Sequence, residues 1–287
     1  MRKLTTELVA DFKRHLCEEE KSQSTLEKYV RDIESFRFWL GEKELNKGCV
    51  LSYKEHLMEN YAGSSVNSML SSLNSLFAYL EWSELSVKTL KMQRQIFASS
   101  EKELSKDEYE RLLAAAMQKG DQRLYLLMQA ICSTGIRVSE VRFITVESVY
   151  RGRAQINCKG KARCAFFPTE LCENLKIYIR EQKIKSGSVF LSKNGNPLDR
   201  SNIWSAMKRL CREAKISPDK VFPHNLRHLF ARTYYTLEKD IVRLADILGH
   251  SSVNTTRIYT MESGEIHRKQ IQSLGLCDDN HIMSIMS

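Results

Sequence analysis

The sequence lacks several features that would place the protein in a membrane or outside the cell. No apolar run approaches the ~18 residues that a membrane span needs. The first residues carry charges throughout, so they do not resemble a signal peptide. No Gly/Pro-rich tract, internal repeat or low-complexity segment occurs. We therefore expect a globular cytoplasmic protein with no membrane partner.

Metal-binding patterns are also missing, although the chain has eight cysteines. No CxxC pair occurs, and no Cys/His cluster has zinc spacing. The cysteines lie in apolar or mixed contexts, which is typical of reduced structural thiols in the cytosol. We predict neither a metal site nor a cofactor. The cysteines are Cys17, Cys49, Cys132, Cys158, Cys164, Cys172, Cys211 and Cys277.

Positive charge is present in excess and is unevenly placed. The formal net charge is +9, yet residues 1–100 contain 14 basic and 14 acidic side chains. The whole surplus therefore lies in residues 101–287. A basic domain favours a polyanion, most often nucleic acid, whereas the plainer interpretation is that the charge only aids solubility.

Hydrophobic periodicity predicts two domains joined by a linker. Residues 1–84 contain four helical stretches, the second of which starts at Ser24 with Glu27 as a capping box. Residues 85–103 mix serine and charge without an apolar stripe, so we predict a linker there.

The second domain is predicted over 104–277, and 278–287 is expected to be a flexible tail. Ser105 and Glu108 form a second capping box at its start. Residues 144–168 contain apolar positions, among them Val146 and Val149, around RGR and KGK turn signals, which predicts a small antiparallel sheet. The remainder is expected to be helical.

Four fragments of the second domain carry reactive side chains. Each has an ordinary interpretation: Arg137 paired with Glu140, a solvated KGK turn, a polar helix face in HNLRH, and Tyr259 as a packing residue. The HNLRH face has no carboxylate at matching spacing, which argues against a metal. The fragments are TGIRVSE (134–140), NCKGKAR (157–163), PHNLRH (223–228) and LGHSSVNTTRIYT (248–260).

Together these fragments fit the cleavage of a phosphodiester without a metal. Two guanidinium groups can hold the two non-bridging oxygens of a phosphate in a fork that lysine cannot reproduce. Imidazole groups transfer protons near neutral pH, and a phenol next to Arg and His becomes a feasible nucleophile.

The order and spacing of these residues resemble the active-site motifs of the tyrosine recombinases, the phage integrase and Xer-like family. The interval from Arg227 to His250 is 23 residues and that from His250 to Tyr259 is 9, as is usual in the family. The resemblance implies a mostly α fold, in which a four-helix core-binding (SAM-like) domain precedes a mainly helical α+β catalytic domain with a small antiparallel sheet. The implied catalytic residues are Arg137, Lys159, His224, Arg227, His250 and Tyr259.

The resemblance also implies a role for each residue. Arg137 and Arg227 would clamp the phosphate, and His250 would add a hydrogen bond. His224 would take the proton of Tyr259, which would form a 3′-phosphotyrosine bond. A lysine of the hairpin would protonate the leaving 5′ oxygen, and Lys159 is favoured for this over Lys161. Glu140 would support Arg137, and His228 would be structural.

The implied partner is double-stranded DNA with short inverted-repeat core sites. The protein would bind this DNA as a homotetramer and would be a monomer in the absence of DNA. Strand exchange would pass through a Holliday junction. The segment GEIHRKQIQSLGL after Tyr259 would dock on a neighbouring subunit. Eight basic residues are candidate DNA contacts: Lys88, Arg94, Arg151, Arg153, Lys161, Arg163, Lys208 and Arg232.

Two other functions compete with site-specific recombination. A type IB topoisomerase uses similar residues to relax supercoils. A DNA-binding regulator could retain the motifs as a relic, although the six intact positions argue against that.

Overall fold

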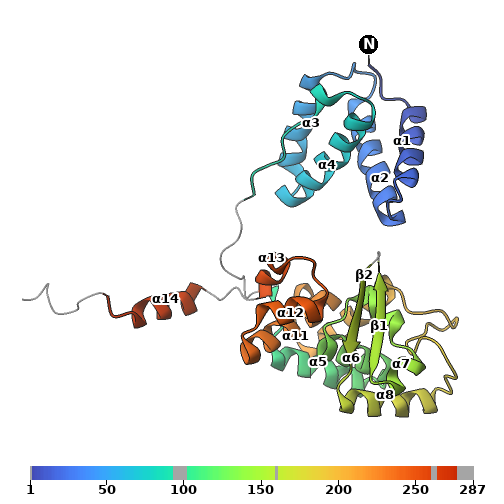
Figure 1. Ribbon diagram of the computed structural model, residues 1–287, viewed down its shortest axis with the longest axis vertical. Coiled ribbons are helices and arrows are strands. Elements are labelled where there is room, and N and C mark those ends of the chain that lie inside the picture. The colour runs from blue at the N-terminus through green and yellow to red at the C-terminus, as the bar shows by residue number, and fades with distance from the viewer. Residues whose placement is uncertain (1, 93–101, 159–160, 260–263, 277–287) are drawn as a thin grey trace, which may run out of the picture. The chain divides into compact units, whose positions relative to one another are not determined.

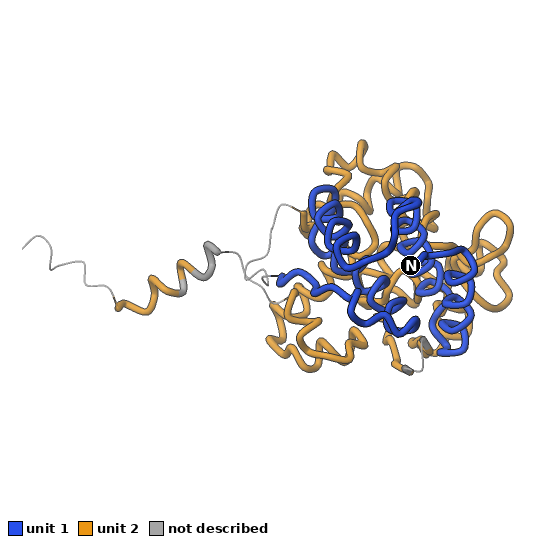
Figure 2. Tube along the Cα trace, turned by 90° about the horizontal axis from the view of Figure 1, so that it is seen from above, with its two compact units in different colours: residues 1–94 blue, residues 95–287 orange. Residues whose placement is uncertain are grey.

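The computed structural model describes residues 2–92, 102–158, 161–259 and 264–276. The chain divides into two compact units, residues 1–94 and 95–287, which Figure 2 colours separately. Helices predominate in both units, and the described residues include a two-stranded antiparallel sheet in the second unit (Figure 1). The predicted fold class is confirmed.

The first unit is a helical bundle around one apolar core. Phe12, Ile33, Phe36, Leu70 and Phe77 are fully buried in it. The helices present their apolar residues at intervals of three and four, so one face of each turns inward. Its elements are α1 (Thr6–Glu18), α2 (Gln23–Leu40), α3 (Lys47–Asn60), α4 (Gly63–Tyr79) and the 3-10 helix η1 (Ser83–Leu85).

The capping box predicted for the second helix does not form. Helix α2 begins at Gln23, and its N-cap is Ser22, two residues before the predicted Ser24. The Ser24 hydroxyl lies 3.1 Å from that of Ser22, and the Glu27 carboxylate accepts a hydrogen bond from the Gln23 amide at 2.9 Å. Both side chains are therefore engaged by neighbours within the first turn rather than by the backbone.

The second unit begins with the capping box predicted at Ser105, which is confirmed. The Ser105 hydroxyl accepts from the backbone N–H of Glu108 at 3.1 Å, and the Glu108 carboxylate accepts from that of Ser105 at 2.9 Å. The elements before the hairpin are α5 (Lys106–Gln118), α6 (Gln122–Thr134), η3 (Val138–Phe143) and α7 (Val146–Tyr150).

The hairpin consists of β1 (Arg153–Cys158) and β2 (Lys161–Phe166), with Arg153 opposite Phe166. The sheet is shorter than predicted, because Val146 and Val149 lie in helix α7. Thr145 caps that helix through the backbone N–H of Ser148. The elements after the hairpin are α8 (Thr169–Glu181), α9 (Arg200–Lys208), α10 (Cys211–Ala214), η4 (Pro218–Lys220), α11 (Pro223–Glu238), α12 (Ile241–Leu248), α13 (Val253–Thr256), η5 (Arg257–Tyr259) and α14 (Gly264–Ser273).

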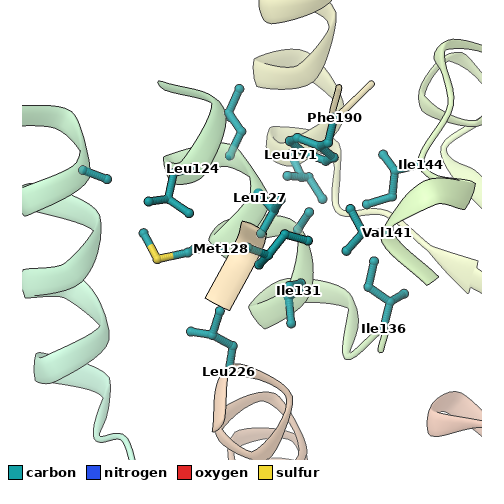
Figure 3. Packing of buried hydrophobic residues seen from close by; sticks show 14 of the residues in the cluster. Leu124, Leu127, Met128, Ile131, Ile136, Val141, Ile144, Leu171, Phe190 and Leu226 are labelled. Carbon is teal, nitrogen blue, oxygen red and sulfur yellow. The ribbon is translucent and has the colours of Figure 1, made fainter. Parts of the chain in front are cut away.

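Helix α6 runs through the core of the second unit (Figure 3). Leu127, Met128 and Ile131 are completely buried, and Leu226 of α11 packs against the same cluster. A helix that is apolar on most sides is held by its neighbours over its whole length. The end of α6 therefore has a fixed position, and the functional residues begin there. In the part of the chain that the structure describes, every helix is too short or too polar to span a bilayer.

Candidate active site

Arg137 lies between the end of α6 and the start of η3. Gly135 ends α6 with a φ of +64°, a left-handed conformation that glycine adopts at no steric cost. A Cβ at this position would lie 2.4 Å from a ring atom of Phe230. Arg137 follows in extended conformation at the N-cap of η3. The rigid core thus positions the backbone of Arg137.

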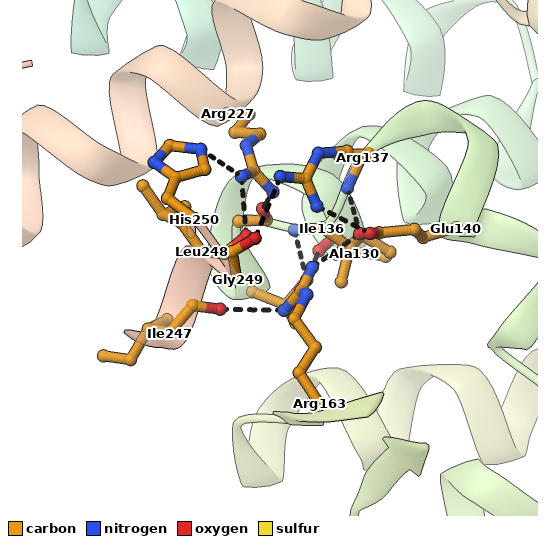
Figure 4. A network of polar contacts seen from close by, with 12 residues as sticks. Ala130, Ile136, Arg137, Glu140, Arg163, Arg227, Ile247, Leu248, Gly249 and His250 are labelled. Carbon is orange, nitrogen blue, oxygen red and sulfur yellow. Dashed lines mark hydrogen bonds and ion pairs between the residues drawn. The ribbon is translucent and has the colours of Figure 1, made fainter. Parts of the chain in front are cut away.

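Three arginines converge on the C-terminal end of α12, as Figure 4 shows. The last carbonyls of a helix have no partner inside it and carry the negative end of its dipole. Three consecutive carbonyls each accept from a different guanidinium group, so residues distant in sequence meet there. The pairs are Arg163 Nη1 with Ile247 O at 2.8 Å, Arg227 Nη2 with Leu248 O at 2.8 Å, and Arg137 Nη2 with Gly249 O at 3.3 Å.

Glu140 links two of these arginines and is only 2% exposed. Its Oε1 accepts from Arg137 Nη1 at 2.9 Å, and its Oε2 accepts from Arg163 Nη2 at 2.5 Å. Burial by itself raises the pKa of Glu140, but the backbone hydrogen bond from Arg137 and the charges of Arg163 and Arg137 outweigh it and lower the pKa. Glu140 therefore stays ionised between the two guanidinium groups.

Gly249 allows this packing because it has no side chain. Its φ is +64°, and a Cβ would lie 2.3 Å from Cδ of Arg163. We expect Gly249→Ala to lower the free energy of unfolding by about 2–4 kcal/mol, because strain at positive φ adds to overpacking. Gly120→Ala is the matched control: its φ is +66°, with nothing within 4 Å of the added Cβ. Equal losses in denaturant titrations of the two variants would contradict the steric argument.

Arg227 is buried, with 2% of its surface exposed. Besides Leu248 O, it donates to Gly135 O and to Nε2 of His250, the latter at 2.9 Å. Burial and then the charge of Arg137 lower the pKa of Arg227 to about 10. That value is still far above neutral pH, so Arg227 remains a cation.

The hydrogen bonds of His250 determine its tautomer. The guanidinium group of Arg227 has only donors, so Nε2 of His250 must accept. The proton then sits on Nδ1, which donates to the hydroxyl of buried Thr256 at 2.9 Å. Burial, followed by the charges of Arg227 and Arg137, lowers the pKa of His250 to about 4. His250 is therefore neutral and orients Arg227.

The ring of Tyr259 lies between two imidazole rings and is 3% exposed. The His228 ring meets it edge-on, with centroids 4.6 Å apart and planes at 75°. The His250 ring lies nearly parallel to it, with centroids 6.0 Å apart. His224 in turn contacts His228 at 4.5 Å between centroids. These ring contacts restrain the phenol of Tyr259 within the second unit.

Five of the six predicted catalytic residues line one cavity of about 530 Å³. An adjoining cavity of about 1040 Å³ shares Arg137 and His250 with it and reaches Arg163 on the hairpin. The residues of the first cavity are Arg137, His224, Arg227, His250 and Tyr259. Cations, imidazoles and a phenol are the groups that phosphoryl transfer through a covalent intermediate needs. Among the described residues, no group of His, Cys, Asp and Glu could hold a metal ion.

His228 has a pKa of about 4, lowered by burial and then by His224 and Arg227, against an ordinary value of 6.5. Between these two pH values the unfolded chain binds more protons than the folded one, so the free energy of unfolding falls as pH falls. We expect the Tm to drop between about pH 7 and about pH 4.5, and His228→Gln to reduce that drop. An unchanged drop in thermal melts of the variant would contradict this account.

The remaining predicted residues are distributed as follows. Lys159 and Arg94 lie outside the described residues, and Lys161 is described only by its backbone in β2. Lys88, Arg151, Arg153 and Arg232 are exposed, and Arg232 pairs with Glu103. Lys208 donates to Pro218 O. Arg163 differs from the exposed residues of this set, because its side chain is 12% exposed and both of its terminal nitrogens bond within the protein.

Sequence reasoning did not single out Thr256 or Gly249. Thr256 acts by accepting from an imidazole six residues away, and Gly249 acts by making room for Arg163. Neither requirement appears as a spacing pattern, because both depend on which side chains the fold brings together.

Family models match both units of the chain. The model described as the phage integrase family matches residues 102–265, and the phage integrase N-terminal SAM-like domain matches residues 9–84. The chain therefore belongs to the phage integrase family, the tyrosine recombinases, and is a site-specific recombinase.

The Xer recombinases are among the relatives of this chain. It is 28% identical over 275 residues to tyrosine recombinase XerA of Thermococcus kodakarensis, covering 92% of this chain and 93% of that protein. It is 26% identical to tyrosine recombinase XerD of Halalkalibacterium halodurans, covering 83% and 87%. The topoisomerase and regulator alternatives gain no support from these relatives.

Solved structures have the same fold. The crystal structure of XerA recombinase matches with a TM-score of 0.53 at 25% identity, covering 94% of this chain and 98% of that one. A lambda integrase (75–356) dimer bound to a COC′ core site matches with a TM-score of 0.74 at 18% identity, covering 91% and 96%.

Proposed function

We propose that the protein cuts and rejoins double-stranded DNA at short inverted-repeat core sites through a 3′-phosphotyrosine intermediate. The observation that carries the proposal is the cavity shared by Tyr259, Arg137 and Arg227, since it combines a nucleophile with two cations. Arg227 is buried and held from three sides, and Arg137 is 40% exposed. One guanidinium group is thus fixed and the other can reach a ligand.

The scissile phosphate would lie between the two arginines. Each guanidinium group would donate to a non-bridging oxygen, so that the charge developing in the transition state is neutralised. His250 would add a hydrogen bond from Nε2. This requires Nε2 to stop accepting from Arg227 and to take up a proton, which a neighbouring phosphate charge favours.

The chemistry would proceed in two transfers. The phenolic oxygen of Tyr259 attacks phosphorus while its proton passes to His224, and the bond from phosphorus to the 5′ oxygen breaks. Lys159 supplies the proton for that leaving oxygen. A 5′-hydroxyl of the partner duplex then attacks the phosphotyrosine and gives its proton to Lys159. The phosphodiester is restored, and the bond to Tyr259 breaks as His224 returns a proton to the phenolic oxygen.

Two rounds of this exchange in a homotetramer would pass through a Holliday junction. One solved structure with this fold is a lambda integrase tetramer bound to a Holliday junction. The exposed basic residues named above would contact DNA phosphates, so DNA binding should weaken steeply with salt. A cytoplasmic location accords with the free cysteines among the described residues.

The proposal is tested by covalent capture. The protein is incubated with nicked duplexes that carry randomised inverted repeats, then denatured, and the DNA that remains attached is sequenced. We expect attached DNA enriched in one pair of inverted repeats and joined through its 3′ end. The absence of any adduct would overturn the proposal. Relaxation of supercoiled plasmids without sequence preference would indicate topoisomerase activity instead.

A further inference from the structure

Arg163 and Arg137 span the same two structural elements. Each guanidinium group donates to Glu140, in η3, and to a carbonyl at the end of α12. Both arginines therefore connect η3 to the end of α12, and their side chains approach it from different directions (Figure 4). They differ in exposure, because the side chain of Arg137 is 40% exposed and that of Arg163 is 12% exposed.

The two bridges also differ in strength. Arg163 bonds at 2.5 Å to Glu140 and at 2.8 Å to Ile247 O. The bond from Arg137 to Gly249 O is 3.3 Å long, close to the limit for an N–H···O hydrogen bond. If Arg137 turned its Nη2 towards a phosphate, it would lose this weak bond, and the link through Arg163 would remain.

Several features commit Arg163 to this position. Its Nε is buried with no hydrogen-bond partner, a cost that a side chain free to move would avoid. Gly249 packs against its Cδ, where any larger residue would collide. Neither feature is expected of a side chain whose role is to contact DNA from solvent.

We infer that Arg163 is a positioning residue: it locks η3 to the end of α12 so that Arg137 can leave Gly249 O for the scissile phosphate without losing its alignment. The inference rests on the proposed function of Arg137. It assigns Arg163 no contact with the reacting atoms, and it replaces the expectation that Arg163 binds DNA directly.

The test uses Arg163→Met and the nicked duplex identified by covalent capture, with single-turnover formation of the adduct as the readout. We expect a rate loss of about 100-fold, as for a small misplacement of a catalytic group, with duplex affinity nearly unchanged. Arg123→Met is the matched control, since Arg123 is part-buried and donates to Leu191 O at 2.6 Å away from the site. We expect the control to cleave within about twofold of the unchanged protein.

A second substrate separates positioning from general loss of structure. In a methylphosphonate, a methyl group replaces one charged oxygen of the scissile phosphate, so the arginine facing that oxygen has less charge to neutralise. We expect one of the two separated diastereomers to reduce the loss caused by Arg163→Met to below about tenfold. The same diastereomer should reduce the loss caused by Arg137→Ala.

The outcomes distinguish the two proposals. Two results would overturn the role of Arg163. In the first, Arg163→Met slows adduct formation by the same factor on both diastereomers as on the phosphodiester. In the second, it slows adduct formation on the phosphodiester no more than Arg123→Met does. If the unchanged protein forms no adduct, the proposed function itself fails. If Arg163→Met shows no cooperative unfolding transition, Arg163→Lys takes its place in the same comparison, because an ammonium keeps the charge but lacks two separated donors.

Discussion

Tyr259→Phe is expected to abolish the covalent adduct while leaving the fold and the DNA affinity intact. The phenyl ring keeps its packing against His228 and His250, so the loss is confined to the oxygen that attacks phosphorus. Adduct formation on the captured duplex should fall by more than about 10⁴-fold, the scale seen when a nucleophile is removed. Binding of the same duplex should change by about twofold or less.

The control for this variant is Tyr235→Phe, in α11, which packs against the same apolar cluster as Tyr259. It removes a hydroxyl from the same neighbourhood but not from the cavity, and it should form the adduct at the normal rate. An adduct from Tyr259→Phe, located by peptide mapping at another residue, would identify a different nucleophile.

Arg227→Ala should have the second-largest effect, because it reduces both activity and stability. The buried carbonyls of Gly135 and Leu248 lose their donor, and the ring of His250 loses its partner. We expect about 3 kcal/mol of lost stability and about a thousandfold slower adduct formation. Unfolding titrations and single-turnover assays measure the two effects separately.

Arg227→Lys separates charge from geometry at this position. An ammonium keeps the positive charge but cannot replace a planar fork that bonds two carbonyls and an imidazole. We expect this variant to recover stability more than activity. Full recovery of the cleavage rate in Arg227→Lys would show that charge alone suffices. Arg111→Ala, which removes a donor to Ala214 O elsewhere in the unit, controls for loss of an arginine.

The polar network explains how three cations can share a small volume. Each guanidinium group faces a carbonyl at the end of α12, and Glu140 supplies a full negative charge to two of them. Desolvation, followed by the charges of Arg227 and Arg137, nevertheless lowers the pKa of both His250 and His224. Neutral imidazoles are the form that can accept a proton from a phenol.

Some local structure followed directly from sequence, and some did not. The capping box at Ser105 forms as predicted, because the serine hydroxyl and one carboxylate oxygen of Glu108 each face the backbone N–H that they cap, while the other carboxylate oxygen accepts from Lys220. The one expected at Ser24 does not form, because Ser22 and Gln23 engage the same side chains. The pattern around Val146 and Val149 predicts strand, yet Thr145 caps a helix there, and both side chains are buried in the core of the second unit.

The sequence by itself determined the family, the mostly helical fold class and the identity of the candidate residues, because a reaction of this kind constrains residue types and their order along the chain. Only the tertiary structure decided how the arginines are held. Carbonyls at the end of α12 are invisible in sequence, since every residue has one, and their role depends on which guanidinium groups the fold places opposite them. For the same reason the sequence predicts only an exposed basic residue at Arg163, whereas in the structure its side chain is largely buried and packs against Gly249.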